Sequence, residues 1–286
     1  MLNKFSVIGH PMGHTMSPFI HKRLFEISDI QVDYSVEDIR PCDLESKMNF
    51  LKTLGGFNIT IPHKQTIIPL LDCLDESAIK YSAVNCVSMV NGKSIGYNTD
   101  AFGFLAALKS GGLKLKGNVV IAGCGGVART MAKEAVLADC HVTLGVIPRS
   151  MTVAESLCAE LNSICKESCR IQFLDKIENK FDLAINATPL GMYPKVGAMP
   201  LTTNQLKNCS SVFDAVYNPH ETLLLKTAKK LGIKAIGGMS MLVWQAAAAH
   251  KYWYNAEFNT SDIEKLIDDS ITEMQRLFHE KITRKV

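Results

Sequence analysis

Hydrophobic and polar positions along the chain follow two alternating periods. Short apolar runs rich in β-branched residues predict strands at residues 5–9, 57–61, 84–90, 94–97, 118–121, 141–144, 171–173, 183–186, 212–216 and 234–236. Apolar residues that recur three or four positions apart predict helices from residue 17, over 102–109 and 127–137, and through the tail from 239, including 261–281. Strands alternating with helices in this way predict an α/β fold with mostly parallel sheets.

Residues with special backbone preferences mark where these elements begin and end. Ser17 is expected to cap the N-terminus of a helix whose first position is Pro18. Asn91-Gly92 is typical of a tight hairpin turn between two strands. Gly111-Gly112 is expected to end the helix over 102–109.

The length of 286 residues suits two domains of ordinary size. The sequence predicts one domain from residues 1–101 together with about 239–286. The second domain is expected to span 102–238. The terminal helices have no strand of their own to pair with, which favours their return to the first domain.

Composition narrows the class of protein without selecting a function. The chain is 47% hydrophobic and 21% charged, and its net charge of +3 is scattered, which favours neither a nucleic acid nor a membrane as partner. No apolar run approaches the roughly 20 residues of a spanning helix. Residues 1–9 have no long apolar run of the kind found in signal peptides, so we expect them to form a first strand instead. The nine cysteines lack zinc-site spacing, so we expect free thiols, no metal and a cytoplasmic location.

A glycine-rich turn follows the predicted strand 118–121 and precedes a helix. It contains Gly123, Gly125 and Gly126, followed by Val127 and Ala128, and it fits the G-x-G-x-x-[GA] pattern. Such a turn lets backbone N–H groups approach a pyrophosphate at a helix N-terminus. A purely structural turn is the alternative, but the strand–turn–helix context favours dinucleotide binding.

The segment after the strand 141–144 bears on the choice of dinucleotide. An acidic residue there would bind the ribose 2′-hydroxyl of NAD, but the segment 145–150 has none and carries Arg149. A guanidinium pairs well with a 2′-phosphate, although a lone arginine is more often solvated. The sequence therefore predicts NADP, with NAD as the alternative.

Small polar residues gather at three places in the predicted first domain. Thr15 and Ser17 stand at a helix start, where a carboxylate binds well, although Ser17 could serve only as a cap. Asn58 and Thr60 point to the same face of a strand, and Lys64 follows them. The third place comprises residues 82–85, which end at Asn85, and residues 96–100, which end at Asp100.

Considered separately, the two charged candidates have ordinary explanations. Asp100 could be only the N-cap of the helix that follows it. Lys64 gains catalytic interest where its surroundings tune or direct its proton.

Eight ordered segments together resemble the shikimate dehydrogenase family. They are residues 8–18, 58–64, 83–86, 96–100, 123–128, 186–192, 214–222 and 241–245. The resemblance covers nearly the whole chain. It implies an N-terminal α/β substrate domain and a Rossmann-like dinucleotide-binding domain, with a cleft between them. It further implies reversible NADPH-dependent reduction of 3-dehydroshikimate to shikimate, in a monomer or homodimer that needs no metal.

The resemblance also assigns roles to residues. Lys64 and Asp100 match the family's catalytic pair. The family's substrate-binding residues correspond to Thr15, Ser17, Asn58, Thr60, Asn85, Tyr217 and Gln245. The resemblance implies cofactor-binding roles for further residues in addition to the glycine turn and Arg149. Thr188, Ala215 and Gly238 match the residues that line the nicotinamide end of the cofactor in the family. A lysine ammonium is suited to stabilise the developing alkoxide and to deliver its proton.

Three departures from the family pattern keep alternatives open. Thr15 replaces a serine, Val153 takes the position of a second arginine near Arg149, and Ser240 replaces a glycine. The change at Thr15 leaves open quinate or another ring acid as substrate, and the change near Arg149 leaves open NAD as cofactor. The effect of Ser240 has no explanation. A non-catalytic sensor of metabolite and nucleotide is a third hypothesis, which the presence of Lys64 and Asp100 disfavours.

Overall fold

The computed structural model describes residues 4–13 and 15–283, which form two compact units. The first unit takes the described residues up to Gly103 together with Val243–Ser270. The second takes Phe104–Leu242 and the described residues from Ile271 onward. Each unit has its own sheet, and the predicted α/β class is confirmed. The domain limits expected from the sequence stay predictions.

The sheet of the first unit has six strands in the order β2-β1-β3-β5-β6-β4. Their bounds are Lys4–Gly9 (β1), Asp33–Asp38 (β2), Gly56–Ile59 (β3), Cys73–Leu74 (β4), Cys86–Val90 (β5) and Lys93–Tyr97 (β6). β1 runs parallel to β2 and β3, whereas β5 is antiparallel to both β3 and β6. The predicted hairpin is confirmed, with Asn91 and Gly92 both at positive φ between β5 and β6.

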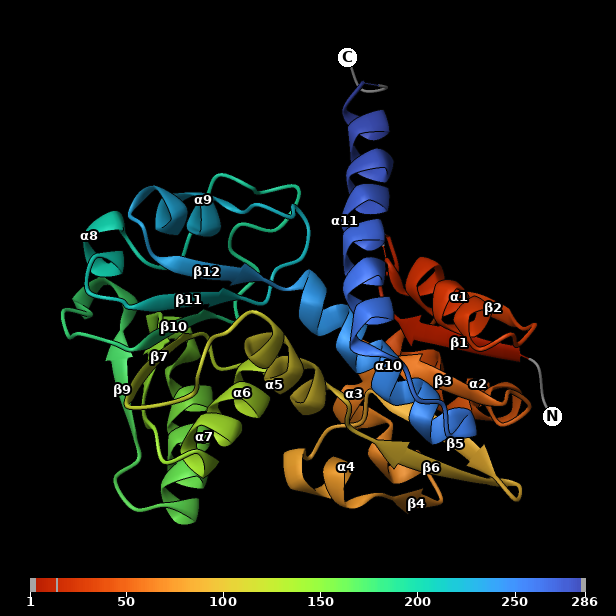
Figure 1. The fold of residues 1–286 in the computed structure, drawn as a ribbon. Coiled ribbons are helices and arrows are strands. Elements are labelled where there is room, and N and C mark those ends of the chain that lie inside the picture. Colours follow the sequence, from red (N-terminus) through yellow and green to blue (C-terminus); the bar gives the residue numbers. More distant parts are fainter. Residues whose placement is uncertain (1–3, 14, 284–286) are drawn as a thin grey trace. The chain divides into compact units, whose positions relative to one another are not determined.

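Helices cover both faces of this sheet (Figure 1). They are α1 (Ser17–Ile27), α2 (Leu44–Leu51), α3 (His63–Thr66), α4 (Glu76–Tyr81) and most of α10 (Met239–Tyr254), with short 3-10 turns at Pro41–Asp43 and Ile68–Leu70. On one face the apolar side chains of α2 and α4 pack with Ile8, Phe57 and Val87. On the other, Phe25 of α1 stacks with Trp253 of α10.

The expected N-cap of α1 is wrong. Ser17 is the first helical residue, and Met16 precedes it without a side-chain cap. The hydroxyl of Thr15 instead accepts a hydrogen bond from the Ser17 backbone N–H at 3.1 Å. Thr15 therefore satisfies one of the free backbone donors at the start of α1, which is the N–H of Ser17 itself.

The sheet of the second unit is wholly parallel, in the order β12-β11-β10-β7-β8-β9. Its strands are Asn118–Ala122 (β7), His141–Val146 (β8), Cys169–Phe173 (β9), Leu183–Asn186 (β10), Ser211–Asp214 (β11) and Lys234–Gly237 (β12). Its helices are α6 (Gly126–Leu137), α7 (Met151–Ile164), α8 (Thr203–Leu206) and α9 (Leu223–Lys230), with 3-10 turns at Pro148–Ser150 and Leu174–Lys176. Three helices are shared by the two units: α5 (Asp100–Ser110), α10 and α11 (Thr260–Thr283).

Alternate residues of β7 explain how both faces of this sheet are buried. Val119 and Ile121 pack into the core under α5, α6 and α7, whereas Val120 packs into the core under α8 and α9. Figure 1 shows these two groups of helices on the two sides of the sheet. A sheet covered on both faces requires continuously apolar strands, which is the pattern that the sequence displays here.

Two further observations concern the expectations from composition. The thiols of all nine cysteines are free. Within residues 4–13 and 15–283, we find no helix with the length and apolar character needed to cross a membrane.

Candidate active site

Four loops of the first unit meet at one edge of its sheet. The parallel strands β1 and β3 end side by side, because Ile8 pairs with Ile59. The antiparallel pairing of Cys86 with Tyr97 brings the start of β5 and the end of β6 to the same edge. The sequence-predicted polar residues follow or precede these strand ends, so the topology gathers them.

Lys64 and Asp100 form an ion pair at this edge. Lys64 lies on α3, Asp100 begins α5, and the Lys64 Nζ lies 2.5 Å from the Asp100 Oδ2. Their side chains are 22% and 10% exposed. Partly buried charges need a partner to offset their lost hydration. The carbonyl oxygen of Lys64 accepts a 2.8 Å hydrogen bond from the N–H of Val84, which ties α3 to the chain entering β5.

Asn85 connects this pair to α10. Its Nδ2 lies 2.9 Å from the Asp100 Oδ1, 2.9 Å from the Thr99 Oγ1 and 3.2 Å from the Gln245 Oε1. An amide nitrogen has only two hydrogens for these three acceptors. The Asn85 Oδ1 accepts the backbone N–H of Thr99 at 2.7 Å. Asn85 therefore holds the Oδ1 of Asp100, while the Oδ2 of the same carboxylate faces Lys64.

Asn98 is a positioning residue that sequence reasoning missed. Its Oδ1 accepts the backbone N–H of Asp100 at 3.0 Å, and its Nδ2 donates to the carbonyl oxygen of Ala83 at 3.0 Å. Asn98 is buried and therefore locks the backbone that carries the Asp100 carboxylate. The signal lay in the segment 96–100, where asparagine immediately precedes Thr99 and Asp100.

Asn58 and Thr60 stand at the end of β3. The Asn58 Oδ1 accepts a 2.7 Å hydrogen bond from the hydroxyl of Tyr34, and its Nδ2 lies 3.5 Å from the carbonyl oxygen of Asn85. Thr60 lies just past the strand, and its methyl group fills the space where a side chain on Gly9 would stand. Tyr34 was not foreseen, because β2 is a mostly polar strand that the hydrophobic pattern does not reveal.

Thr15 and Ser17 lie together where α1 begins. The Thr15 Oγ1 donates to the Ser17 Oγ at 3.1 Å, in addition to accepting the Ser17 N–H. The two hydroxyls therefore stand beside the free backbone donors of a helix N-terminus, which favour an anionic group. Neither is joined by a hydrogen bond to the ion pair of Lys64 and Asp100 in the part of the chain that is described.

The glycine turn of the second unit needs residues without a side chain. Gly123 has φ +107°, and a Cβ there would lie 3.0 Å from the carbonyl oxygen of Ala187. Gly125 precedes the first residue of α6 and has open space where a Cβ would stand, as does Gly126. The first glycine is thus required by the backbone, whereas the others leave the helix N-terminus accessible to a phosphate.

A pocket of about 430 Å³ extends from this turn. It is lined by Gly123, Gly125, Arg149 and Thr188 among the predicted cofactor residues. Arg149 is exposed and has no ion-pair partner in the described chain. Val153 also lines the pocket and is 51% exposed, so the wall beside Arg149 is apolar.

Buried hydrogen bonds hold the loop after β10 in place. The Asn186 Oδ1 accepts the Thr188 hydroxyl at 2.7 Å, and its Nδ2 donates to the Asp214 Oδ1 at 2.9 Å. Asp214 also accepts the Thr222 hydroxyl at 2.6 Å, where Thr222 caps α9. Burial raises the pKa of Asp214 to about 6, although its hydrogen bonds oppose that shift.

The remaining predicted residues of this unit lie outside the 430 Å³ pocket. Gly126 and Val127 belong to the first turn of α6. A Cβ on Gly238 would overlap the carbonyl group of Ala215, so the structure brings these two residues into contact. Tyr217 follows β11, and burial raises the pKa of its hydroxyl. Tyr217 belongs to the second unit, whereas the other predicted substrate-binding residues belong to the first.

The donor set does not suit a metal ion. Among residues 4–13 and 15–283, no three histidine, cysteine or acidic side chains are grouped so as to hold one. The charged chemistry of the first unit is instead a lysine and a carboxylate.

Comparison with known proteins places this geometry in a family. Residues 7–87 match the family model for the shikimate dehydrogenase substrate-binding domain. A shikimate dehydrogenase (NADP(+)) of Methanocaldococcus jannaschii is 38% identical over 273 residues, which are 93% of this chain and 96% of that protein. The chain belongs to the shikimate dehydrogenase family.

Two solved structures of the family are similar to this chain over most of its length. The shikimate 5-dehydrogenase of Thermus thermophilus, in complex with NADP(H) and shikimate, is 32% identical with a TM-score of 0.85, over 94% of this chain and all of that chain. The enzyme of Listeria monocytogenes, in complex with shikimate and NAD, is 26% identical with a TM-score of 0.83, over 93% and 96% of the two chains. The family resemblance drawn from the sequence is therefore confirmed.

Proposed function

We propose that this chain is an NADP-dependent shikimate dehydrogenase, which reversibly reduces 3-dehydroshikimate to shikimate on the route to aromatic amino acids. The observation that carries the proposal is the ion pair of Lys64 and Asp100 within a chain of this family. A sensor that only bound its ligands would not need this charged pair at the edge of the substrate-binding unit.

In the proposed reaction, Lys64 and Asp100 handle the proton. When the ring ketone is reduced, its oxygen gains negative charge, which the Lys64 ammonium stabilises before it donates a proton. Asp100 holds the ammonium and accepts a hydrogen bond from the substrate hydroxyl. In the oxidative direction the same proton returns from the hydroxyl to the lysine, so the pair serves both directions.

The neighbouring polar residues are proposed to orient the ring acid. Asn58, Thr60, Asn85 and Gln245 supply amide and hydroxyl groups of the kind that bind ring hydroxyls. Thr15 and Ser17 are proposed to bind the carboxylate at the start of α1. Tyr217 of the second unit is proposed to bind a ring hydroxyl as well.

The second unit has residues that fit NADP. Bound NADPH supplies a hydride, which is chemistry that amino-acid side chains lack. The glycine turn offers backbone donors to its pyrophosphate, and the exposed guanidinium of Arg149 suits the 2′-phosphate. Thr188, Ala215 and Gly238 are proposed to line the nicotinamide end, and Gly126 with Val127 to present the helix N-terminus.

The test is a matrix of substrates and cofactors. Purified protein would be offered shikimate or quinate with NADP⁺ or NAD⁺, and reduction would be followed at the nicotinamide absorbance band. We expect the highest kcat/KM with shikimate and NADP⁺. Ligand binding without turnover in all four pairs would contradict the proposed function and would favour a sensor.

A second candidate is a related dehydrogenase that prefers quinate or NAD⁺. Thr15 adds a methyl group at the proposed carboxylate site, and Val153 leaves Arg149 as the one basic side chain on the cofactor pocket. Higher kcat/KM with quinate or with NAD⁺ in the same matrix would favour this candidate.

The location and assembly of the protein are also proposals. Nine free thiols suit a reducing cytoplasm. We propose a cytoplasmic monomer or homodimer, whose mass light scattering would measure and whose location cell fractionation would test. No nucleic acid or membrane partner is proposed.

A further inference from the structure

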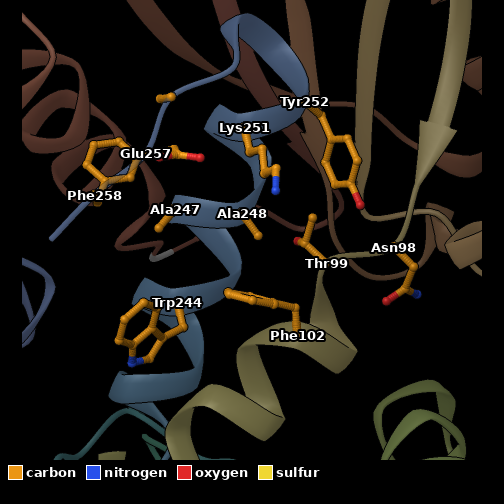
Figure 2. A pocket seen from close by; sticks show the side chains of 11 residues that line it. Asn98, Thr99, Phe102, Trp244, Ala247, Ala248, Lys251, Tyr252, Glu257 and Phe258 are labelled. Carbon is orange, nitrogen blue, oxygen red and sulfur yellow. The ribbon is translucent and has the colours of Figure 1, made fainter. Parts of the chain in front are cut away.

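A second pocket of the first unit is not accounted for by the proposed reaction. Its volume is about 390 Å³, and it lies between the start of α5, one side of α10 and the segment 255–258 (Figure 2). All of its lining residues belong to the first unit. Small-molecule sites occupy about 300–1,000 Å³, so the pocket is large enough for a compact ligand.

Aromatic rings and small side chains form the walls. Phe102, Trp244, Tyr252 and Phe258 supply the rings. The rings of Phe102 and Trp244 meet edge to face, with centroids 6.3 Å apart. Ala247 and Ala248 of α10 also line the pocket, and Figure 2 shows how short their side chains are beside the rings. These walls would accept a flat apolar group, because aromatic rings pack well edge to face or offset.

One charge of each sign stands over the same pocket. Figure 2 shows the Lys251 ammonium turned toward Thr99 and Ala248, and the Glu257 carboxylate on the side of Phe258. Within the described chain, neither side chain has a hydrogen-bond or ion-pair partner. An ammonium and a carboxylate that do not neutralise each other are complementary to a ligand that carries both charges.

We propose that this pocket binds a small aromatic zwitterion, of the class of a free aromatic α-amino acid. Its ring lies against Phe102, Trp244 and Phe258. Its carboxylate pairs with Lys251 and its ammonium pairs with Glu257. The apolar walls supply burial, and the two charges select against molecules that carry only one of them.

The pocket wall also belongs to the hydrogen-bond network of the candidate active site. Thr99 lines the pocket, while its Oγ1 lies 2.9 Å from the Asn85 Nδ2 and 3.3 Å from the Gln245 Oε1. Asn98, another lining residue, holds the backbone of Asp100. A bound ligand therefore contacts residues that position the substrate-binding amides, and its occupancy changes the KM for shikimate. This coupling, unlike the binding itself, rests on the proposed function.

Binding is tested by calorimetry with the full chain and L-phenylalanine. We expect saturable heat, and affinities weaker by about tenfold or more for 3-phenylpropionate and for phenethylamine, which each lack one charge. Lys251→Met and Glu257→Gln should each weaken binding of L-phenylalanine by about tenfold. Lys22→Met and Glu264→Gln make the same changes at exposed positions away from the pocket and should leave binding unchanged.

A fluorescence measurement locates the bound molecule. The chain has two tryptophans, of which Trp244 lines the pocket and Trp253 packs against Phe5. L-Phenylalanine should change the emission of the wild type but not that of Trp244→Phe. Absence of saturable heat, or equal affinity in the wild type and both charge variants, would overturn the proposed site.

The coupling has its own measurement. The KM for shikimate should change in the presence of L-phenylalanine in the wild type, and should not change in Lys251→Met. Binding without any change in KM would overturn the coupling. Binding by a protein that lacks turnover would instead contradict only the proposed function, so the two failures are distinguishable.

Discussion

The candidate substrate site and the candidate cofactor site are built in opposite ways. In the first unit, Lys64, Asp100 and Asn85 are charged or polar side chains that already satisfy one another. In the second unit, the glycine turn is shaped by the absence of side chains, and Arg149 is exposed without an ion-pair partner among the described residues. One region is a preformed network, whereas the other is an accessible surface with one free charge.

The difference follows from what each region must do in the proposed reaction. Proton transfer needs groups held within hydrogen-bond distance, and preorganised groups need no rearrangement when charge develops. Binding a pyrophosphate needs backbone donors and space at a helix N-terminus. Substitutions in the first region should therefore reduce turnover, and those in the second should reduce cofactor affinity.

The largest expected effect comes from removing the lysine. Lys64→Ala should lower kcat for shikimate oxidation by about 10²- to 10⁴-fold, because it removes the acid–base group, and should leave the affinity for NADP⁺ unchanged. Steady-state kinetics and calorimetry would measure the two quantities. If the two residues act as a unit, the double variant with Asp100→Asn should be hardly worse than Lys64→Ala. A kcat close to that of the wild type in Lys64→Ala would contradict the proposed roles.

The two units should respond to pH in opposite directions. Burial lowers the pKa of His21 to about 3 and holds that of its hydrogen-bonded neighbour His250 well below the usual value. A neutral His21 stabilises the folded state above pH 6.5, and this stability is lost as pH falls toward 3, by about 1.4 kcal/mol per pH unit. His250 acts in the same direction, because its pKa is also lowered by burial. The raised pKa of Asp214 has the reverse effect, since its stabilisation is lost as pH rises through about 6.

Urea unfolding at several pH values would measure this contrast. Trp253 lies 5.2 Å from the His21 ring and reports on the first unit. His21→Leu should flatten the loss of stability between pH 6.5 and 5, whereas Asp214→Asn should remove the opposing trend of the second unit. Identical unfolding midpoints for the wild type at pH 7 and pH 5 would contradict the assignment for the histidines.

Arg149 should affect the cofactor alone. Arg149→Gln should raise the KM for NADP⁺ by about tenfold through loss of a charge-assisted hydrogen bond, and should leave the KM for NAD⁺ unchanged. Lys116→Gln removes an exposed charge of the same unit outside the pocket and serves as the control. Equal losses with both cofactors would show that Arg149 does not contact the 2′-phosphate.

Tyr34 should give the smallest effect. Tyr34→Phe removes the donor that orients the Asn58 amide, and should raise the KM for shikimate by about two- to tenfold with little change in kcat. Kinetics with shikimate would measure this split. A loss confined to kcat would assign Tyr34 a different role.

The sequence predicted the parts of the molecule that follow from local pattern. The continuously apolar strands of the second sheet and the hairpin at Asn91-Gly92 were correct because their signals lie within a few residues. The family motifs also singled out Lys64 and Asp100, which the structure joins. Their catalytic roles stay predictions.

Features that depend on distant partners were not predictable. β2 was missed because it carries mostly polar residues, and with it the hydrogen bond from Tyr34 to Asn58. The cap assigned to Ser17 was wrong, because α1 begins at Ser17 itself, and the backbone N–H of Ser17 is bound by the Thr15 hydroxyl. The anchoring roles of Asn98 and Asp214 appear only when β6, β10 and β11 have placed their partners.

The most direct test follows the hydrogen itself. Shikimate deuterated at the carbon whose hydroxyl is oxidised would be incubated with NADP⁺ and the purified wild-type chain, and the reduced cofactor analysed by mass spectrometry. We predict NADPH that carries the deuterium, in an amount equal to the 3-dehydroshikimate formed. Unlabelled NADPH, or no reduced cofactor at all from correctly folded protein, would contradict hydride transfer by this chain.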